Sequence, residues 1–284
     1  MSRRELDRGG PWLWTWAAAT ALLLLAPTLV VIPLSFTGEA SFVLPPKSWS
    51  LRWYEEFFTD PGWRDALMSS LRVALATTLV ATVLGTAAAY GLSRMRGRAA
   101  ALVNGLLLSP LIMPQVVTAV AVLAVYLRWQ LNGTLIGFVA AHTMLAMPYV
   151  VVTVQSSLRG YDRSLDLAAA GLGAGAWTRF RTVTLPLLTS GILSGAVFAF
   201  VVSLDDVVIA VYLQTPALRT LPVEMYDSVT VDVDPTIAAA ATLILAVTTA
   251  LLLLPSLIRH KKTDRKKTDR KKTDPQKTGR VRLP

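Results

Sequence analysis

The 284-residue sequence contains no cysteine and only two histidines, His142 and His260. The absence of cysteine excludes disulfides, thiol catalysis and cysteine-based zinc sites, and two histidines are too few for a histidine-rich metal site. We therefore predict neither a catalytic residue nor a metal ligand. The sequence also lacks a Gly-x-x-x-x-Gly-Lys-Ser/Thr motif, so the chain has no phosphate-cradling loop of its own. Any use of ATP requires a separate subunit.

The net charge of +10 comes almost entirely from the C-terminal tail. From Arg259 to the end there are 12 Lys and Arg against 3 Asp, which leaves 16 basic and 15 acidic residues in the rest of the chain. The tail repeats KKTDR at 261–265 and 266–270, followed by KKTD. Such low complexity predicts a disordered basic tail over 259–284, near anionic lipid headgroups. We predict no nucleic-acid binding.

Long apolar segments dominate the sequence, which is 53% hydrophobic with a mean hydropathy of +0.50. A helix needs roughly 20 apolar residues to cross about 30 Å of hydrocarbon. This length predicts an all-α polytopic membrane protein with six transmembrane helices, near 12–34, 67–92, 102–127, 134–155, 187–213 and 236–258. We divide the chain into a cytoplasmic N-terminal segment (1–11), a membrane domain (12–258) and the tail.

The distribution of charge predicts the orientation. Arginines mark the turn at 94–98 and the loop at 159–188, whereas the last external loop, 214–235, is acidic. By the positive-inside rule both termini lie in the cytoplasm. In the first external loop, Leu51–Phe58 has aromatics at helical spacing, and we expect this helix to lie along the membrane surface.

The loop at 159–188 is too polar to cross a bilayer and too long for a simple connection. We predict a short helix from Ser164, as its cap, to Ala170, and a second helix from Ala176 to Val183 that ends before Pro186. Glycines between the two helices loosen the backbone.

This loop resembles the EAA loop of ABC-importer permeases, the type I (MetI-like) family. The resemblance rests on Asp166, Leu167, Ala168, Ala169, Gly173, Ala174, Phe180, Leu185 and Pro186. One departure is Leu167, which stands where the family usually has Glu, with Asp166 just before it. The resemblance implies a six-helix permease in a bacterial inner membrane whose loop docks on separate ATPase subunits, which bind ATP and Mg. It also implies a second permease, which we expect to form a heterodimer, and an extracytoplasmic solute-binding protein.

The fifth apolar segment contains two adjacent carboxylates, Asp205 and Asp206. Intramembrane acids mark pathways but also pair with other groups, so substrate contact and pairing with helix ends or a partner permease both remain open. The element Ser203-x-Asp-Asp, with Thr220-Leu221-Pro222 and 234–239, is similar to spermidine/putrescine permeases. We select as translocation-path candidates Pro114, Gln115, Ser203, Asp205 and Asp206. Gln115 stands where similar permeases often have a carboxylate.

Three alternatives remain at this stage. The solute could be another small molecule, such as an amino-acid-like compound, a phosphonate or ferric iron. A secondary transporter would work without ATP. An intramembrane aspartyl hydrolase would need two carboxylates that converge on one site, which neighbours on a helix do not. We expect the intramembrane His142 to be a hydrogen-bonded packing residue.

Overall fold

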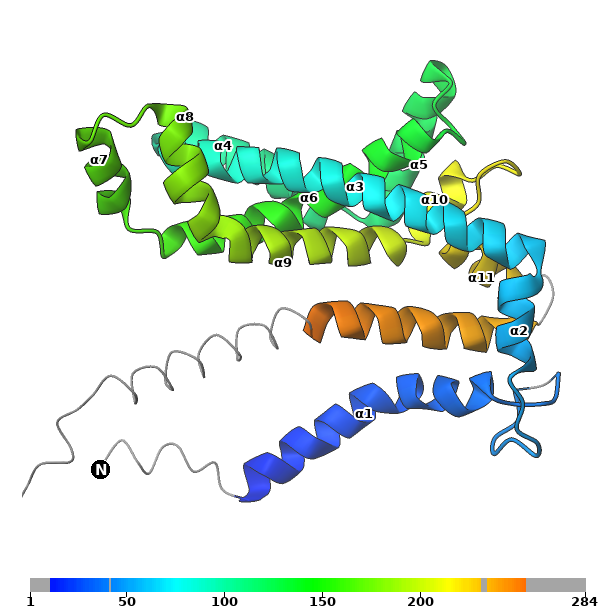
Figure 1. Cartoon of the computed structure of the whole chain (residues 1–284). Coiled ribbons are helices and arrows are strands. Elements are labelled where there is room, and N and C mark those ends of the chain that lie inside the picture. Colours follow the sequence, from blue (N-terminus) through cyan, green and yellow to red (C-terminus); the bar gives the residue numbers. More distant parts are fainter. Residues whose placement is uncertain (1–10, 41, 231–233, 254–284) are drawn as a thin grey trace, which may run out of the picture.

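The computed structural model describes residues 11–40, 42–230 and 234–253, and within them the chain is helical (Figure 1). The elements are α1 (Pro11–Ser35), α2 (Arg52–Thr59), α3 (Pro61–Arg94), α4 (Gly97–Leu108), η1 (Ser109–Leu111), α5 (Gln115–Trp129), α6 (Leu135–Arg159), α7 (Arg163–Gly171), α8 (Ala176–Arg179), η2 (Phe180–Thr184), α9 (Leu185–Leu204), α10 (Val208–Leu213) and α11 (Leu221–Thr230). The C-terminal helix follows at Thr236–Leu253. The predicted basic tail and residues 254–258 of the sixth segment lie outside these ranges.

In the described residues, four helices are long and apolar enough to cross a membrane, and up to six if each bent pair forms one span. The bent pairs are Trp12–Ala26 with Thr28–Ser35, at 44°, and Gly97–Leu111 with Gln115–Trp129, at 98°. The all-α polytopic class is therefore confirmed.

The third segment, predicted over 102–127 with a bend at its prolines, is divided into two helices. The chain turns by 98° between Leu111 and Gln115. Pro110 lies in η1, just before this turn, and Pro114 lies just before α5. Pro114 has an extended ψ of 125° and stands immediately before the first residue of α5. A proline removes a helical hydrogen bond and disfavours the helical conformation of the residue before it, so two prolines four residues apart break this helix.

The fifth segment also differs from its predicted range of 187–213, at both ends. The second loop helix does not end before Pro186, because α8 runs through η2 directly into α9. Leu185 donates its N–H to Phe180 five residues back, a wider π-turn that lies directly before the proline. At the other end, the helix stops at Leu204 and restarts as α10 after Val207.

The centre of the molecule is formed by α3, α6 and α9, which lie along one another (Figure 1). Small residues allow this close packing. A Cβ on Gly195 of α9 would lie 2.7 Å from Thr153 Oγ1 and 3.1 Å from Val150 Cα of α6. A Cβ on Gly191 would lie 2.2 Å from Ser157 Oγ. The spacing Gly-x-x-x-Gly is typical of helices that approach through their backbones within a membrane.

Gly195→Val should therefore destabilise the protein by about 1–3 kcal/mol, because α6 must move away from α9. The measurement is the thermal unfolding midpoint of the purified protein in detergent. Gly91→Val on α3 is the matched control, because a Cβ there meets nothing within 4 Å. Equal midpoints for the two variants would show that this close approach is not needed.

A second core joins α2, α11 and the C-terminal helix at the opposite end of α3 from the 159–188 loop (Figure 1). Its buried members are Phe57, Trp63, Leu221 and Ala240. Trp53 and Phe57 of α2 are buried in the protein, whereas Phe58 is exposed, and the position of this aromatic helix along the membrane surface stays a prediction. The acidic loop after α10 also contributes to the protein interior, since the first three residues of α11 are buried.

Candidate functional site

A buried polar cluster forms where the fifth segment breaks. Asp206 lies between α9 and α10, and its Oδ2 accepts the N–H of Ala210 at 3.1 Å. Its Oδ1 accepts a hydrogen bond from Gln115 Nε2 at the start of α5. The carboxylate thus satisfies a backbone donor that the broken helix leaves free, and it ties α10 to α5.

His142 of α6 also belongs to this cluster. It is 1% exposed, its Nδ1 lies 2.9 Å from Ser203 Oγ, and its Nε2 lies 3.7 Å from Asp206 Oδ2. The expectation of a hydrogen-bonded packing histidine agrees with this contact. Ser203 and Asp206 of the fifth segment are therefore brought together with Gln115 of the third, and Pro114 directly precedes Gln115.

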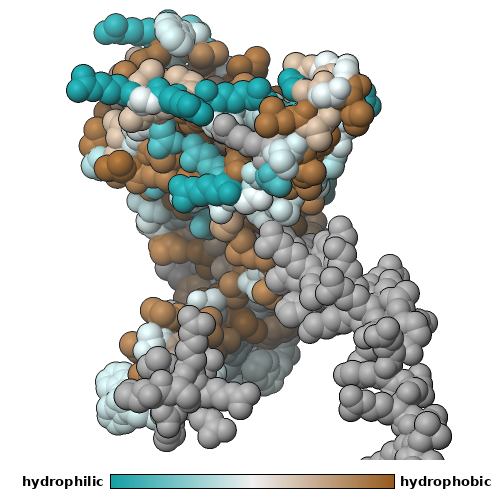
Figure 2. Space-filling model, turned by 90° about the vertical axis from the view of Figure 1, so that its left-hand side faces the viewer, coloured by the Kyte–Doolittle hydropathy of each residue, from teal (hydrophilic) through white to brown (hydrophobic). Residues whose placement is uncertain are grey.

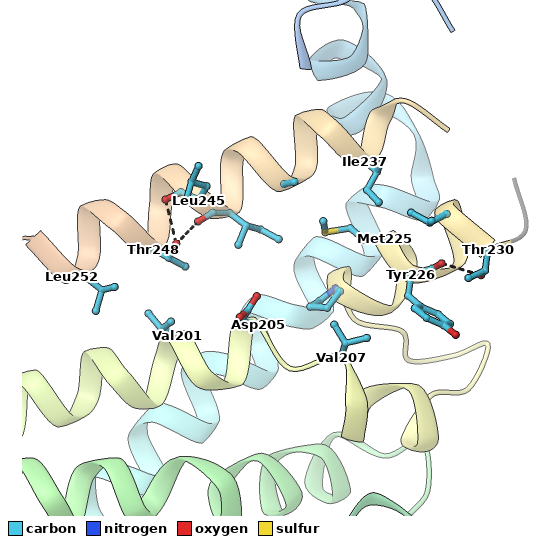
Figure 3. Close-up of a pocket in the computed structure, with 14 residues that line it drawn as sticks. Val201, Asp205, Val207, Met225, Tyr226, Thr230, Ile237, Leu245, Thr248 and Leu252 are labelled. Atoms are coloured by element: carbon cyan, nitrogen blue, oxygen red, sulfur yellow. Dashed lines mark hydrogen bonds between the residues drawn. The ribbon is translucent and has the colours of Figure 1, made fainter. Parts of the chain in front are cut away.

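Asp205 points away from this cluster, although it is the next residue in the chain. It is exposed and borders a cavity of about 600 Å³ between α9, α11 and the C-terminal helix (Figure 3). The other lining side chains are mostly apolar: Val201, Val207, Pro222, Met225, Tyr226, Val229, Thr230, Ile237, Ala241, Ile244, Leu245, Thr248 and Leu252. Of these side chains, only that of Asp205 carries a formal charge, so the cavity offers one carboxylate in an apolar wall.

The 159–188 loop folds into the two predicted helices, with a different cap. The N-cap of α7 is Asp162 and not Ser164: Asp162 Oδ1 accepts the N–H of Ser164 at 2.9 Å. This hydrogen bond lowers the pKa of the Asp162 carboxyl below its ordinary value. The carboxylate therefore stabilises the start of α7 at neutral pH, and this contribution is lost as the pH falls through the lowered pKa.

Gly173 ends α7 in a left-handed conformation, with φ of +84°. The N–H of Gly173 donates to Ala170 O at 2.9 Å, and the N–H of Ala174 donates to Ala169 O at 3.1 Å. This pair of bonds is the Schellman motif, in which the residue after the C-cap has positive φ and is usually glycine. The spacing of the alanines and the glycine in the sequence thus has a structural reason.

The loop exposes large apolar side chains to its surroundings. Leu167 and Trp177 are 70% exposed and Leu172 is 90% exposed. Figure 2 looks onto this end of the molecule and shows hydrophobic residues side by side with hydrophilic ones. Large exposed apolar side chains such as these are typical of a protein–protein contact surface.

Asp166 faces the body of the protein. Its carboxylate lies 3.7 Å from Arg179 Nε and 3.9 Å from Arg94 Nη2, and its side chain is 19% exposed. The sequence interpretation missed Arg94, because no short-range pattern links the end of α3 to a residue 72 positions later. The only available signal was that both lie in segments predicted to be cytoplasmic.

Known proteins match this chain over most of its length. It is 35% identical over 247 residues to the putrescine transport system permease protein PotI of Escherichia coli K12, covering 83% of this chain and 86% of the relative. It is 31% identical over 262 residues to the spermidine/putrescine transport system permease protein PotC of the same strain, covering 91% and 96%. The molybdenum transport system permease protein ModB of Mycobacterium bovis is 33% identical, covering 80% and 88%.

Solved structures show the same fold. A chain from a bacterial ABC transporter involved in the import of the polysaccharide alginate matches with a TM-score of 0.67 at 14% identity, covering 91% of this chain and 98% of that chain. A second structure of an alginate ABC transporter, in complex with an alginate-bound periplasmic protein, matches with a TM-score of 0.68 at 13% identity, covering 89% and 95%.

Fold and sequence together define a multi-span permease subunit of an ABC importer in the inner membrane, a transport protein and not itself an enzyme. The chain belongs to the family of binding-protein-dependent transport system inner membrane components, whose model matches residues 81–266. The secondary transporter and the intramembrane hydrolase are thereby set aside.

Proposed function

We propose that this permease subunit translocates a polyamine, putrescine or spermidine, and that Asp205 contacts it. The observation that carries the proposal is the cavity in Figure 3, in which Asp205 supplies a carboxylate to an apolar wall. A polyamine alternates ammonium groups with short methylene chains. The carboxylate suits an ammonium group, and side chains such as Met225 and Ile237 suit the methylenes.

The names of two relatives support a polyamine as the solute, and the name of a third points to a different solute. Two that cover most of the chain are named for putrescine and for spermidine/putrescine, whereas a third is named for molybdenum. The family therefore accommodates different solutes, and the charge of the cavity favours a cation here. An amino-acid-like compound, a phosphonate or ferric iron is the alternative.

The remaining path candidates have a supporting role in this proposal. Ser203 and Asp206 are buried behind Asp205, and Gln115 with Pro114 fixes the start of α5 against Asp206. Movement of α5 would therefore alter the wall in which Asp205 stands. We propose that these four residues shape the path and that Asp205 touches the solute.

The chain is proposed to work with the partners of an ABC importer. One of two ATPase subunits, which bind ATP and Mg, docks on the loop through Leu167, Leu172 and Trp177, the exposed apolar surface of α7 and α8. A binding protein delivers the solute from outside, and a second permease, in a heterodimer, and lipid cover the apolar side chains that α1 exposes. Both termini lie in the cytoplasm.

Asp205→Asn tests whether Asp205 contacts a cationic solute. The change keeps the shape of the side chain and removes its charge, so ATP-dependent uptake of putrescine or spermidine should fall about tenfold, the effect of about 1.4 kcal/mol in binding. The measurement is uptake of the radiolabelled polyamine into proteoliposomes that contain the complete transporter. Asp65→Asn, at an exposed acid of α3, is the control. Unchanged uptake at normal expression would reject Asp205 as a solute contact.

A further inference from the structure

The end of α3 at Arg94 contacts two parts of the 159–188 loop, α7 and η2. Arg94 lies 3.9 Å from Asp166 of α7. One turn earlier, the ring of Tyr90 lies 5.1 Å from that of Phe180 in η2. The Arg94 guanidinium stands over the Tyr90 ring at 4.5 Å and donates a hydrogen bond to its hydroxyl. These two residues of α3 therefore form one contact surface for the loop.

Within this contact surface, the pair of Arg94 and Asp166 attaches α7 to α3. A cavity of about 310 Å³ separates α7 from the ends of α3 and α6, and Asp166 stands at its edge. Asp166 Oδ1 and Arg179 Nε are both buried and face each other at 3.7 Å, beyond hydrogen-bond distance. The distance between Asp166 Oδ1 and Arg179 Nε can therefore shorten when α7 is displaced.

The carboxylate of Asp166 is engaged within the chain. Asp166 stands next to Leu167, the position at which EAA loops usually have Glu, yet it faces two arginines of its own chain, whereas Leu167 is 70% exposed. The loop therefore presents an apolar residue outward and uses its acidic residue to attach to α3.

The far end of α3 reaches the cavity at Asp205. With 34 residues at 1.5 Å each, α3 is about 50 Å long. Toward its other end, Ser70 Oγ accepts the N–H of Leu221 at 2.7 Å, a buried contact with the first residue of α11. Pro222 and Met225 of α11 line the cavity. A continuous series of contacts thus runs from the loop, along one helix, to the proposed solute site.

We propose that α3 transmits the movement of the docking loop to the Asp205 cavity, and that Arg94 and Tyr90 are the positioning residues that attach the loop to it. The inference rests on the proposed function, because it requires the loop to be the ATPase dock. A rigid helix that is attached at both ends carries displacement, and α3 thus adds a second connection to the direct continuation of the loop into α9.

The test separates docking from transmission. The complete transporter, with its ATPase subunits and binding protein, is reconstituted in proteoliposomes, and both ATP hydrolysis and solute uptake are measured. Arg94→Ala should keep the ATPase subunits bound and hydrolysing ATP, while uptake per ATP falls at least about fivefold, the lower end of typical coupling effects. Arg94→Lys, which keeps the charge, should recover most of the uptake.

Two comparisons make the result decisive. Arg98→Ala removes an exposed arginine from the same cytoplasmic turn, one without an ion pair to any described residue, and should behave as the original protein. Ser70→Ala, at the other attachment, should lower uptake per ATP in the same way as Arg94→Ala. Unchanged uptake per ATP in Arg94→Ala, or loss of the ATPase subunits from that variant, would overturn the proposal. Failure of the unaltered chain to bind an ATPase would instead reject the proposed function.

Discussion

Asp206→Ala is expected to destabilise the protein by about 1–3 kcal/mol, the usual cost of leaving a buried polar group without its hydrogen-bond partner. The variant removes the acceptor of the Gln115 amide and of the Ala210 N–H, and the group facing His142 Nε2 at 3.7 Å. The Ala210 N–H and His142 Nε2 would be left unpaired in the protein interior, where such a group is costly, whereas Gln115 is exposed. The measurement is the thermal unfolding midpoint in detergent.

Two variants calibrate this result. Asp205→Ala alters the neighbouring, exposed carboxylate and should change the midpoint little, although it should reduce uptake. Asp206→Asn keeps an oxygen acceptor and should be less destabilising than alanine. If Asp206→Ala unfolds at the same temperature as Asp205→Ala, Asp206 does not hold the break between α9 and α10.

Gly173→Lys is expected to reduce co-purification of the ATPase subunits at least about tenfold, which corresponds to about 1.4 kcal/mol of binding. A residue with a Cβ is disfavoured at a φ of +84° by roughly 1–2 kcal/mol, so the end of α7 is distorted. The added side chain also projects from the proposed docking surface, where a Cβ meets nothing within 4 Å. Membrane insertion should be unaffected.

Gly97→Lys is the matched control. Gly97 also has positive φ, at +74°, also has open space around its Cβ position, and is the first residue of α4, outside the 159–188 loop. The two variants share the same change of charge and a similar backbone cost, and differ in whether they alter the loop. Gly173→Ala adds the backbone cost without the long side chain, and its effect should be intermediate. Normal recovery of ATPase with Gly173→Lys would place the dock elsewhere.

Helix positions followed from hydrophobic length, but helix breaks did not. The predicted third and fifth segments are apolar enough to be continuous, and each is broken in the structure. At Pro110 and Pro114 the break has a local cause, and the sequence predicted a bend although not its size. The break at Asp205 depends on Gln115 and His142, which come from other helices.

In the 159–188 loop, too, the local features could be predicted from the sequence and the long-range contacts could not. The alanines and Gly173 follow from hydrogen bonds within seven residues, so their pattern could be recognised in the sequence. The partners of Asp166 lie 72 residues before it and 13 residues after it, and only folding brings Arg94 and Arg179 to that carboxylate.

The sequence by itself determined the membrane-spanning class, the family resemblance and the place of the loop, because these depend on hydrophobic runs and short spacings. Only the tertiary structure decided that the adjacent Asp205 and Asp206 differ, one bordering a cavity and the other buried beside His142. The reason is physical: a carboxylate in the protein interior is tolerated where donors from several helices converge on it, and that convergence exists only after the helices have packed.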